Sequence, residues 1–393
     1  MHFDEIRAYE KQYVMQTYGR NEIALVNGKG AHLYDSEGKE YIDLTSGIGV
    51  NCLGYQHEAQ AQAICDQVQH LMHCSNLFYS EPMACVAKEL IESTCMSRVF
   101  FANSGAEANE GMIKTARKYS SDHYGNDRYK IVTLRQSFHG RTMTTLMATG
   151  QDKFHQYFYP LPEGFVYASA SDFEEFKTHI DEHVCAVIME MIQGEGGVVP
   201  LDQEFVKQVS AYCKERDVLV CVDEVQTGIG RTGTLFCYEQ YGIEPDIVSA
   251  AKGLGGGVPI GAVLCGEKCA DTLQAGQHGS TFGGNLLACR SAQAVLSVVN
   301  QPAFLQEVKE KGTYLKEQLL ALHSPAIHDV RGLGLMIGVG VDPEKRSGYV
   351  KQLQEKGVLV LTAGADTIRL LPPLVITKED IDQAVACMKE VLK

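Results

Sequence analysis

The chain alternates short apolar runs with longer amphipathic segments, and this alternation predicts its secondary structure. Runs of six or seven residues rich in Val, Ile, Phe and Leu predict buried strands, at 97–103, 129–134, 185–190, 218–224 and 245–251. Good helix formers in amphipathic spacing predict helices between them, over 105–121 and 202–217. Near-continuous apolar strands alternating with helices are typical of an α/β fold with a mostly parallel sheet covered by helices. Such a sheet binds ligands at the carboxyl ends of its strands.

The two ends of the chain show a different pattern. Residues 20–45 hold short apolar stretches separated by Gly turns, which predicts antiparallel strands. After about residue 300 the pattern predicts helices at both limits and strands between them, namely helices 303–323 and 378–393 and strands 335–342, 357–364 and 367–373. We therefore expect a large domain of residues 49–295 and a smaller α+β domain assembled from residues 1–48 and 296–393.

Composition and charge exclude several classes of protein. The chain has 393 residues, of which 45% are hydrophobic, which is ample for a large core. A formal net charge of −14 argues against a nucleic-acid partner. No apolar run approaches the roughly 18 residues of a membrane span, so we expect no membrane association. The first residues, MHFDEIRAYEKQY, lack the apolar core of a secretion signal, and we expect a cytoplasmic protein.

The thirteen cysteines favour reduced thiols over disulfides. Their number is odd, and they are scattered through apolar runs such as VLVCVDE and HVCAVIME. No CxxC pair occurs, and Cys265 and Cys269 lack a second pair of His or Cys residues that could complete a zinc site. We expect no metal site.

Three features of the large domain could carry chemistry. Ser104, Gly105 and Ala106 follow a predicted strand and open a helix, where free amide groups favour a phosphate, although an ordinary N-capped helix has the same pattern. Asp223 ends a predicted strand and could bind a metal, act as a base, hold a protonated nitrogen or cap a helix. Lys252 lies among small and apolar residues in SAAKGLGGGVPIGA, where desolvation would leave a neutral amine that attacks carbonyls. A lone lysine of this kind more often extends its ammonium group to solvent.

Taken together, the three features point to one cofactor. A phosphate cup, a carboxylate and a lysine at one edge of a parallel sheet match pyridoxal phosphate. The cup would bind the phosphate, Asp223 would keep the ring nitrogen protonated, and Lys252 would hold the aldehyde covalently, which explains a lysine in apolar surroundings.

Nearly the whole chain also resembles a known family. The segments YIDLTSGIGVNCLG, FFANSGAEANEGMIKTARKY, SFHGRTMTTLMATG, IQGEGGVVP, CVDEVQTGIGRTGTLF, PDIVSAAKGLGGGVPIGA, HGSTFGGNLLAC and IRLLPPL are similar, in this order, to those of class III (fold-type I) pyridoxal-phosphate aminotransferases. The resemblance implies transfer of the ω-amino group of N2-acetylornithine, or of a close ω-amino acid, to 2-oxoglutarate, as in arginine biosynthesis. Ornithine, succinylornithine, succinyldiaminopimelate and 4-aminobutyrate are alternative donors, and an aminomutase, racemase or decarboxylase is a further alternative.

The resemblance also implies roles for individual residues around the cofactor. Lys252 matches the lysine that binds the aldehyde and then transfers the proton, and Asp223 matches the partner of the ring nitrogen. The remaining cofactor ligands implied are Phe138 and Val225 on the two ring faces, Gln226 at the phenolic oxygen, and Ser104, Gly105 and Ala106 at the phosphate. Thr281 matches a phosphate ligand supplied by the neighbouring subunit, which implies a homodimer, and Ser280 is a candidate substrate contact.

Two arginines and one glutamate match the family's carboxylate recognition. Arg141 matches the distal arginine, and Arg369 matches the arginine that binds the α-carboxylate of glutamate or 2-oxoglutarate. Glu195 matches the carboxylate that neutralises Arg369 when the ω-amino donor is bound, so that one pocket accepts both substrates.

The chain departs from the family pattern at a few positions. Tyr55 and Glu58 stand where the family usually has His and Pro, which leaves substrate access open, and Met191 replaces a proline. His139 fits the acetylornithine type. A non-catalytic nucleotide-binding protein is the competing class, since GLGGG and GLGLMIGVG are Gly-rich, but neither has the full GxGxxG spacing.

Overall fold

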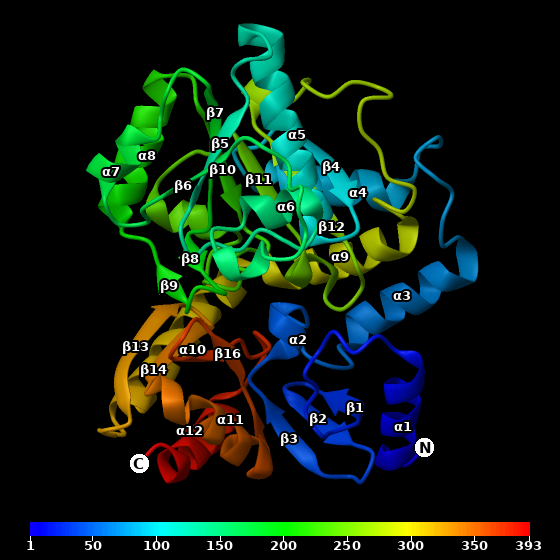
Figure 1. Ribbon diagram of the computed structural model, residues 1–393. Helices are drawn as coiled ribbons and strands as arrows, with labels where there is room; N and C mark the ends of the chain where they lie inside the picture. The colour runs from blue at the N-terminus through cyan, green and yellow to red at the C-terminus, as the bar shows by residue number, and fades with distance from the viewer.

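The computed structural model describes residues 1–393 and shows a large body above a smaller one (Figure 1). A seven-stranded sheet forms the centre of the large body, in the order β4, β12, β11, β10, β7, β5, β6. These strands are β4 (Arg98–Ala102), β5 (Lys130–Leu134), β6 (Phe165–Ala168), β7 (Val184–Met189), β10 (Leu219–Asp223), β11 (Ile247–Ala250) and β12 (Gly261–Cys265). Only β12 runs antiparallel to its neighbours, so the predicted mostly parallel sheet is confirmed.

Alternate strand residues build two separate hydrophobic layers. Ile188 and Cys221 face one layer with Met112 of α5, whereas Val187 and Val222 face the other layer, to which α8 and α9 contribute. Each strand is therefore apolar on both faces, which is the reason for the near-continuous apolar runs. The helices of this body are α3 (Glu58–His70), α4 (Glu81–Glu92), α5 (Gly105–Tyr124), α6 (Met143–Ala148), α7 (Phe173–Thr178), α8 (Gln203–Glu215) and α9 (Leu286–Val299).

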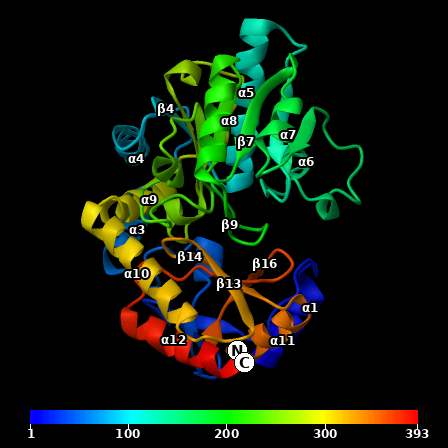
Figure 2. The ribbon, with the colours of Figure 1, turned by 90° about the vertical axis from the view of Figure 1, so that its left-hand side faces the viewer.

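The smaller body contains both termini, as Figures 1 and 2 show. One sheet joins β1 (Leu25–Lys29), β2 (His32–Asp35), β3 (Glu40–Asp43) and β15 (Val358–Leu359), so it combines both ends of the chain. The other sheet has the order β13 (Ile327–Leu333), β14 (Met336–Val341), β17 (Thr367–Leu370), β16 (Leu361–Ala363). The helices are α1 (Phe3–Tyr13), α10 (Pro302–Leu320), α11 (Pro343–Glu355) and α12 (Lys378–Val391). The domain limits at 48/49 and 295/296 stay a prediction.

Several short elements lie between the larger ones along the chain. They are α2 (Ser46–Gly49), the two-stranded β8 (Ile192–Gln193) and β9 (Val199–Pro200), and the 3₁₀ turns Asp152–Phe154, Cys237–Tyr241, Lys252–Gly255 and Glu267–Cys269. No helix is long and apolar enough to cross a membrane. No group of three or more His, Cys, Asp or Glu side chains is placed to hold a metal ion, and all thirteen cysteines are free thiols.

The predicted elements agree with the structure with one correction. The predicted strands of the central sheet end within two residues of the observed limits, and the predicted helices within three. The single strand predicted over 357–364 is wrong, because the chain leaves one sheet after Leu359 and joins the other at Leu361. A continuous apolar run does not show that its two halves pair with different strands.

Candidate active site

A cavity of about 400 Å³ lies where several strands of the large sheet end. Its lining includes the predicted residues Ser104, Gly105, Ala106, Phe138, Arg141, Asp223, Val225, Gln226 and Lys252. The ends of β4, β10 and β11 are followed directly by the 104–106 turn, by Val225 and by Lys252, so the topology brings distant segments to one edge of the sheet.

The N-terminus of α5 closes one wall of the cavity. Ser104 is the N-cap, and its hydroxyl accepts from the Glu107 amide at 3.2 Å. The amides of Gly105 and Ala106 precede the first intrahelical bond and have no helical acceptor, so they are available to an anion. A Cβ atom on Gly105 would lie 2.6 Å from Val225 Cγ1, so only glycine lets the helix start this close to Val225.

Asp223 lies at the floor of the cavity with only 4% of its surface exposed. Its Oδ2 accepts from Asn109 Nδ2 at 2.7 Å and lies 2.8 Å from His139 Nδ1, while its Oδ1 accepts from the Val225 amide at 3.0 Å. These contacts fix the orientation of the carboxylate. Sequence reasoning missed Asn109, which occupies a buried position of α5 one turn after Gly105. A polar residue on the same helix face as Gly105 was the sequence feature that could have indicated it.

Lys252 begins the 3₁₀ turn after β11 and has a backbone φ of +43°, a value that non-glycine residues rarely adopt. Its side chain lines the cavity and takes part in no hydrogen bond or ion pair with the protein. Burial lowers the pKa of Lys252 below its ordinary value, and the negative charges of Asp223 and Glu195 only partly oppose this effect. A lowered pKa makes the neutral amine, the form that attacks an aldehyde, more accessible than in a solvated lysine.

Glu190 is a second carboxylate of the cavity, which sequence reasoning missed. It directly follows β7 and accepts from the Phe138 amide at 2.9 Å and from the Gly194 amide at 3.3 Å. Burial raises the pKa of Glu190 to about 7, and His139 opposes the shift. The signal was the same as for Asp223, since both carboxylates end an apolar strand. Glu190 thus ties the loop of Phe138 to the loop of Glu195.

Arg369 and Glu195 form an ion pair beside the cavity. The Nη1 atom of Arg369 lies 2.5 Å from Glu195 Oε1 and also donates to Gln226 Oε1 at 3.0 Å. Arg369 is 3% exposed, whereas 30% of the Glu195 side chain is exposed, so the glutamate is the partner in contact with solvent. The Nε atom of Arg369 is buried without a hydrogen-bond partner and remains available to a ligand.

The other predicted residues lie at the margin of the cavity or outside it. Arg141 has no carboxylate partner, and its guanidinium lies over the rings of Phe154 and Phe138, at 4.5 and 5.5 Å from their centroids. Ser280 accepts from Asn103 Nδ2 at 3.0 Å, and Asn103 lines the cavity. Thr281 is exposed and does not line the cavity of its own chain.

The departures from the family pattern lie outside the cavity. Tyr55 donates its hydroxyl to the buried Asp43 at 2.7 Å, and burial raises the pKa of Tyr55. Met191 is fully buried in the core, and Glu58 is exposed at the start of α3. None of the three lines the cavity.

An anion-binding helix start, a buried carboxylate and a desolvated lysine at the strand ends of a parallel sheet define a pyridoxal-phosphate enzyme. The family described as Aminotransferase class-III matches residues 13–392, and the chain belongs to this family.

Similar proteins agree with this assignment over nearly the whole chain. The acetylornithine aminotransferase of Haemophilus ducreyi is 49% identical over 391 residues, covering 99% of this chain and 98% of the relative. That of Caldanaerobacter subterraneus subsp. tengcongensis is 49% identical over 386 residues, covering 98% of each. The ornithine aminotransferase structure from Toxoplasma gondii superposes with a TM-score of 0.96 at 31% identity, covering 100% of this chain and 95% of its own. The N-acetylornithine aminotransferase structure from Stenotrophomonas maltophilia gives a TM-score of 0.84 at 35% identity, covering 98% and 97%.

The residues present fit pyridoxal phosphate, the cofactor of the family. One Toxoplasma gondii ornithine aminotransferase structure reports partial occupancy of this cofactor at the active site. In the present chain, free amides at α5 suit its phosphate, and the buried Nε2 of His139 has no protein partner. When bound, pyridoxal phosphate supplies an aldehyde carbon and an electron-withdrawing ring.

Proposed function

We propose that this aminotransferase moves the ω-amino group of N2-acetylornithine to 2-oxoglutarate, giving N-acetylglutamate 5-semialdehyde and glutamate. The observation that carries the proposal is the Arg369–Glu195 ion pair beside Lys252, because a neutralised arginine suits an uncharged part of the ω-amino donor. When Glu195 moves away, the same arginine binds a carboxylate bidentately. The 49% identical relatives named above support acetylornithine as the donor.

We infer the roles of the residues from the family resemblance, and their positions support them. Lys252, whose pKa is lowered by burial, would hold the cofactor and, as a neutral amine, would take and return the proton of the substrate carbon. Asp223, fixed by Asn109 and His139, would hold a proton at the cofactor's ring nitrogen. Val225 and Phe138 line the cavity and would contact the cofactor's ring, and Gln226 is the partner proposed for its phenolic oxygen.

Substrate recognition uses both ends of the cavity. Arg141 has no carboxylate partner and lies at the cavity wall, so it is free to bind the far carboxylate of either substrate. Arg369 binds only the carboxylate next to the reacting carbon of glutamate or 2-oxoglutarate. Ser280, held by Asn103, is a proposed substrate contact.

A panel of amine donors with 2-oxoglutarate, ranked by kcat/KM, tests this function. N2-acetylornithine should rank first. Ornithine is the second candidate, because the Toxoplasma gondii ornithine aminotransferase superposes with a TM-score of 0.96. A higher kcat/KM for ornithine, succinylornithine, succinyldiaminopimelate or 4-aminobutyrate would replace acetylornithine as the donor, and absence of transfer to 2-oxoglutarate would contradict the proposal.

We further propose that the working unit is a homodimer in which Thr281 completes the partner's phosphate site. Support comes from the exposure of Thr281 outside its own cavity and from the neighbouring Phe282, which is 60% exposed. Mixing a Lys252→Ala chain with a Thr281→Ala chain tests it, because a hybrid dimer would contain one complete site. Activity recovered on mixing supports the shared site, and activity no greater than the sum of the separate chains contradicts it. A cytoplasmic location, proposed from the scattered free thiols, is tested by cell fractionation.

A further inference from the structure

A row of three residues crosses the second sheet of the smaller body below the active site. Arg331 of β13 pairs with Gly338 of β14, and Gly338 pairs with Arg369 of β17. Directly paired residues point to the same face of a sheet, so the two arginines stand on one face with a gap between them. The gap exists because the central residue is glycine.

The loop that carries Glu195 occupies this gap. A Cβ atom on Gly338 would lie 2.9 Å from Val198 Cβ and 3.2 Å from the Gly197 carbonyl oxygen, so the loop needs the glycine. On one side of the gap Arg369 binds the Glu195 side chain, and on the other Arg331 Nε donates to the Gly197 oxygen at 2.9 Å. The two arginines therefore hold the same loop two residues apart.

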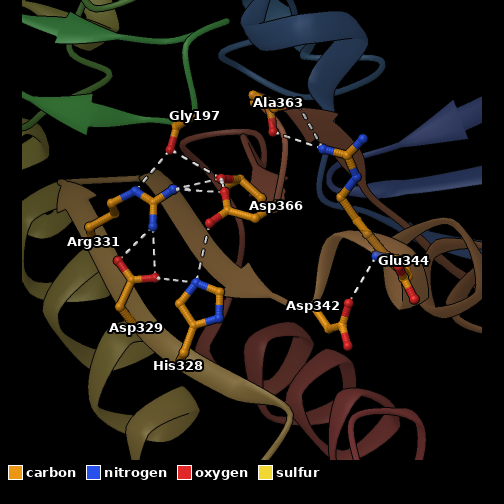
Figure 3. Close-up of polar contacts among 11 residues, drawn as sticks. Gly197, His328, Asp329, Arg331, Asp342, Glu344, Ala363 and Asp366 are labelled. Atoms are coloured by element: carbon orange, nitrogen blue, oxygen red, sulfur yellow. Dashed lines mark hydrogen bonds and ion pairs between the residues drawn. The ribbon is translucent and has the colours of Figure 1, made fainter.

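Arg331 itself is firmly held. Figure 3 shows its guanidinium between Asp329, Asp366 and the Gly197 carbonyl. Its Nη1 donates to Asp329 at 2.7 and 2.5 Å, and its Nη2 donates to Thr367 Oγ1 at 2.6 Å. Thr367 precedes Arg369 by two residues on β17, so Arg331 contacts both the loop of Glu195 and the strand of Arg369.

The loop has a conformation that needs such support. Val198 is fully buried and has a φ of +55°, a left-handed value that a β-branched residue adopts only under constraint. Residues in this region persist where surrounding contacts fix them. Besides Arg331, the Gly364 amide donates to the Glu195 carbonyl at 2.9 Å.

We propose that Arg331 is a positioning residue that sets the resting place of Glu195 against Arg369 and thereby the balance between the two substrates. This inference rests on the proposed function. With the Gly197 backbone held, Glu195 leaves Arg369 by side-chain motion when 2-oxoglutarate enters and returns to the same place afterwards. Without the hydrogen bond from Arg331 to Gly197, the loop moves away from the gap over Gly338, and Arg369 loses its neutralising partner. The site then favours dicarboxylates over the ω-amino donor.

Two variants test the inference in the holoenzyme. Arg331→Lys keeps the charge but loses the planar fork that contacts loop and strand together. Gly338→Ala fills the gap with a Cβ atom and provides a second test if Arg331→Lys folds poorly. The probe is glutarate, an unreactive five-carbon dicarboxylate, whose Kd is measured by calorimetry. Both variants should bind glutarate more tightly, while kcat/KM for the ω-amine half-reaction falls, each by about two- to thirtyfold.

Two controls separate positioning from general damage. His328→Gln alters the same cluster, where His328 Nε2 lies 3.2 Å from Asp366 Oδ2, but makes no contact with the loop, so it should shift neither quantity. In a Glu195→Ala background, Arg331→Lys should no longer change the glutarate Kd, because the group that it positions is absent.

The outcomes distinguish this inference from the proposed function. Equal slowing of both half-reactions with unchanged glutarate binding would overturn the positioning role, as would an effect of Arg331→Lys that persists without Glu195. If glutarate fails to bind the unaltered enzyme, the role of Arg369 in the proposed function fails, and the inference fails with it.

Discussion

Replacing Arg369 with alanine separates the two half-reactions of this aminotransferase. Arg369 should contact only glutamate or 2-oxoglutarate, whose carboxylate lies next to the reacting carbon, whereas the ω-amino donor meets an arginine already paired with Glu195. Arg369→Ala should therefore slow the 2-oxoglutarate half-reaction far more than the ω-amine half-reaction. Arg141→Ala should slow both, because each substrate carries a carboxylate at its far end.

The size of the effect follows from the surroundings of Arg369. The side chain is 3% exposed and its buried Nε has no partner, so an incoming carboxylate would meet donors already shielded from water. Loss of a charge-assisted bidentate contact removes about 1.5–3 kcal/mol, which is about ten- to a hundredfold in kcat/KM. Glu195 also loses its cation and would repel the second substrate, which adds to the loss.

Single-turnover absorbance changes follow each half-reaction separately. Arg216→Ala is a matched control, since Arg216 lies at the end of α8 and pairs with Glu215 away from the cavity. The double variant Arg369→Ala/Glu195→Gln should recover the part of the loss that comes from repulsion. Equal slowing of both half-reactions in Arg369→Ala would refute the proposed exchange of partners, even though the family assignment would stand.

Three further changes test the site and its support. Asp223→Asn should lower kcat by about a hundredfold or more. An asparagine has only one oxygen, so either the Val225 amide or the Asn109 and His139 side chains lose the oxygen that they contact in Asp223. Near-normal turnover would make Asp223 structural only. Gly105→Ala should weaken cofactor binding and cost about 1–3 kcal/mol of stability, measured by cofactor titration and thermal unfolding, because the added Cβ meets Val225. Burial raises the pKa of Glu224 to about 7 in the folded protein, whereas a glutamate in the unfolded chain has a pKa of about 4.3. Between these two values the folded protein retains a proton that the unfolded chain releases, so the free energy of unfolding falls as the pH rises. Glu224→Gln should flatten that fall, by roughly 4 kcal/mol at most, in denaturant titrations across this pH range, and an unchanged slope would contradict the cause given.

Much of the site could be predicted because its chemistry leaves local traces in the sequence. Asp223 ends a fully apolar strand, and Lys252 is the one charged residue among small and apolar neighbours. Glu190 has the same signal as Asp223, since it ends the predicted strand 185–190, but it was not considered as a ligand. Asn109 and His139 become partners of Asp223 only through the packing of α5 and the 135–141 loop against β10, which no local pattern shows.

For the fold as for the site, features encoded in a short stretch of sequence were predicted, and features that depend on contacts between distant residues were not. Five of the seven central strands were predicted from their apolar runs, whereas β6 and β12 were missed. The direction of β12 depends on its pairing with β4 and β11, which no local pattern shows. β13 was missed because its residues are only partly buried and mix polar with apolar types. The row of Arg331, Gly338 and Arg369 depends on strand register and was equally invisible.

The most direct test of the central claim is to find which residue holds the cofactor. The enzyme is reduced with borohydride, digested, and its peptides are examined by mass spectrometry. The cavity at the strand ends, with Asp223 at its floor and a desolvated amine at its wall, predicts the pyridoxyl group on Lys252. Attachment to another lysine, or no attachment to the cofactor-loaded enzyme, would contradict this assignment of the active site.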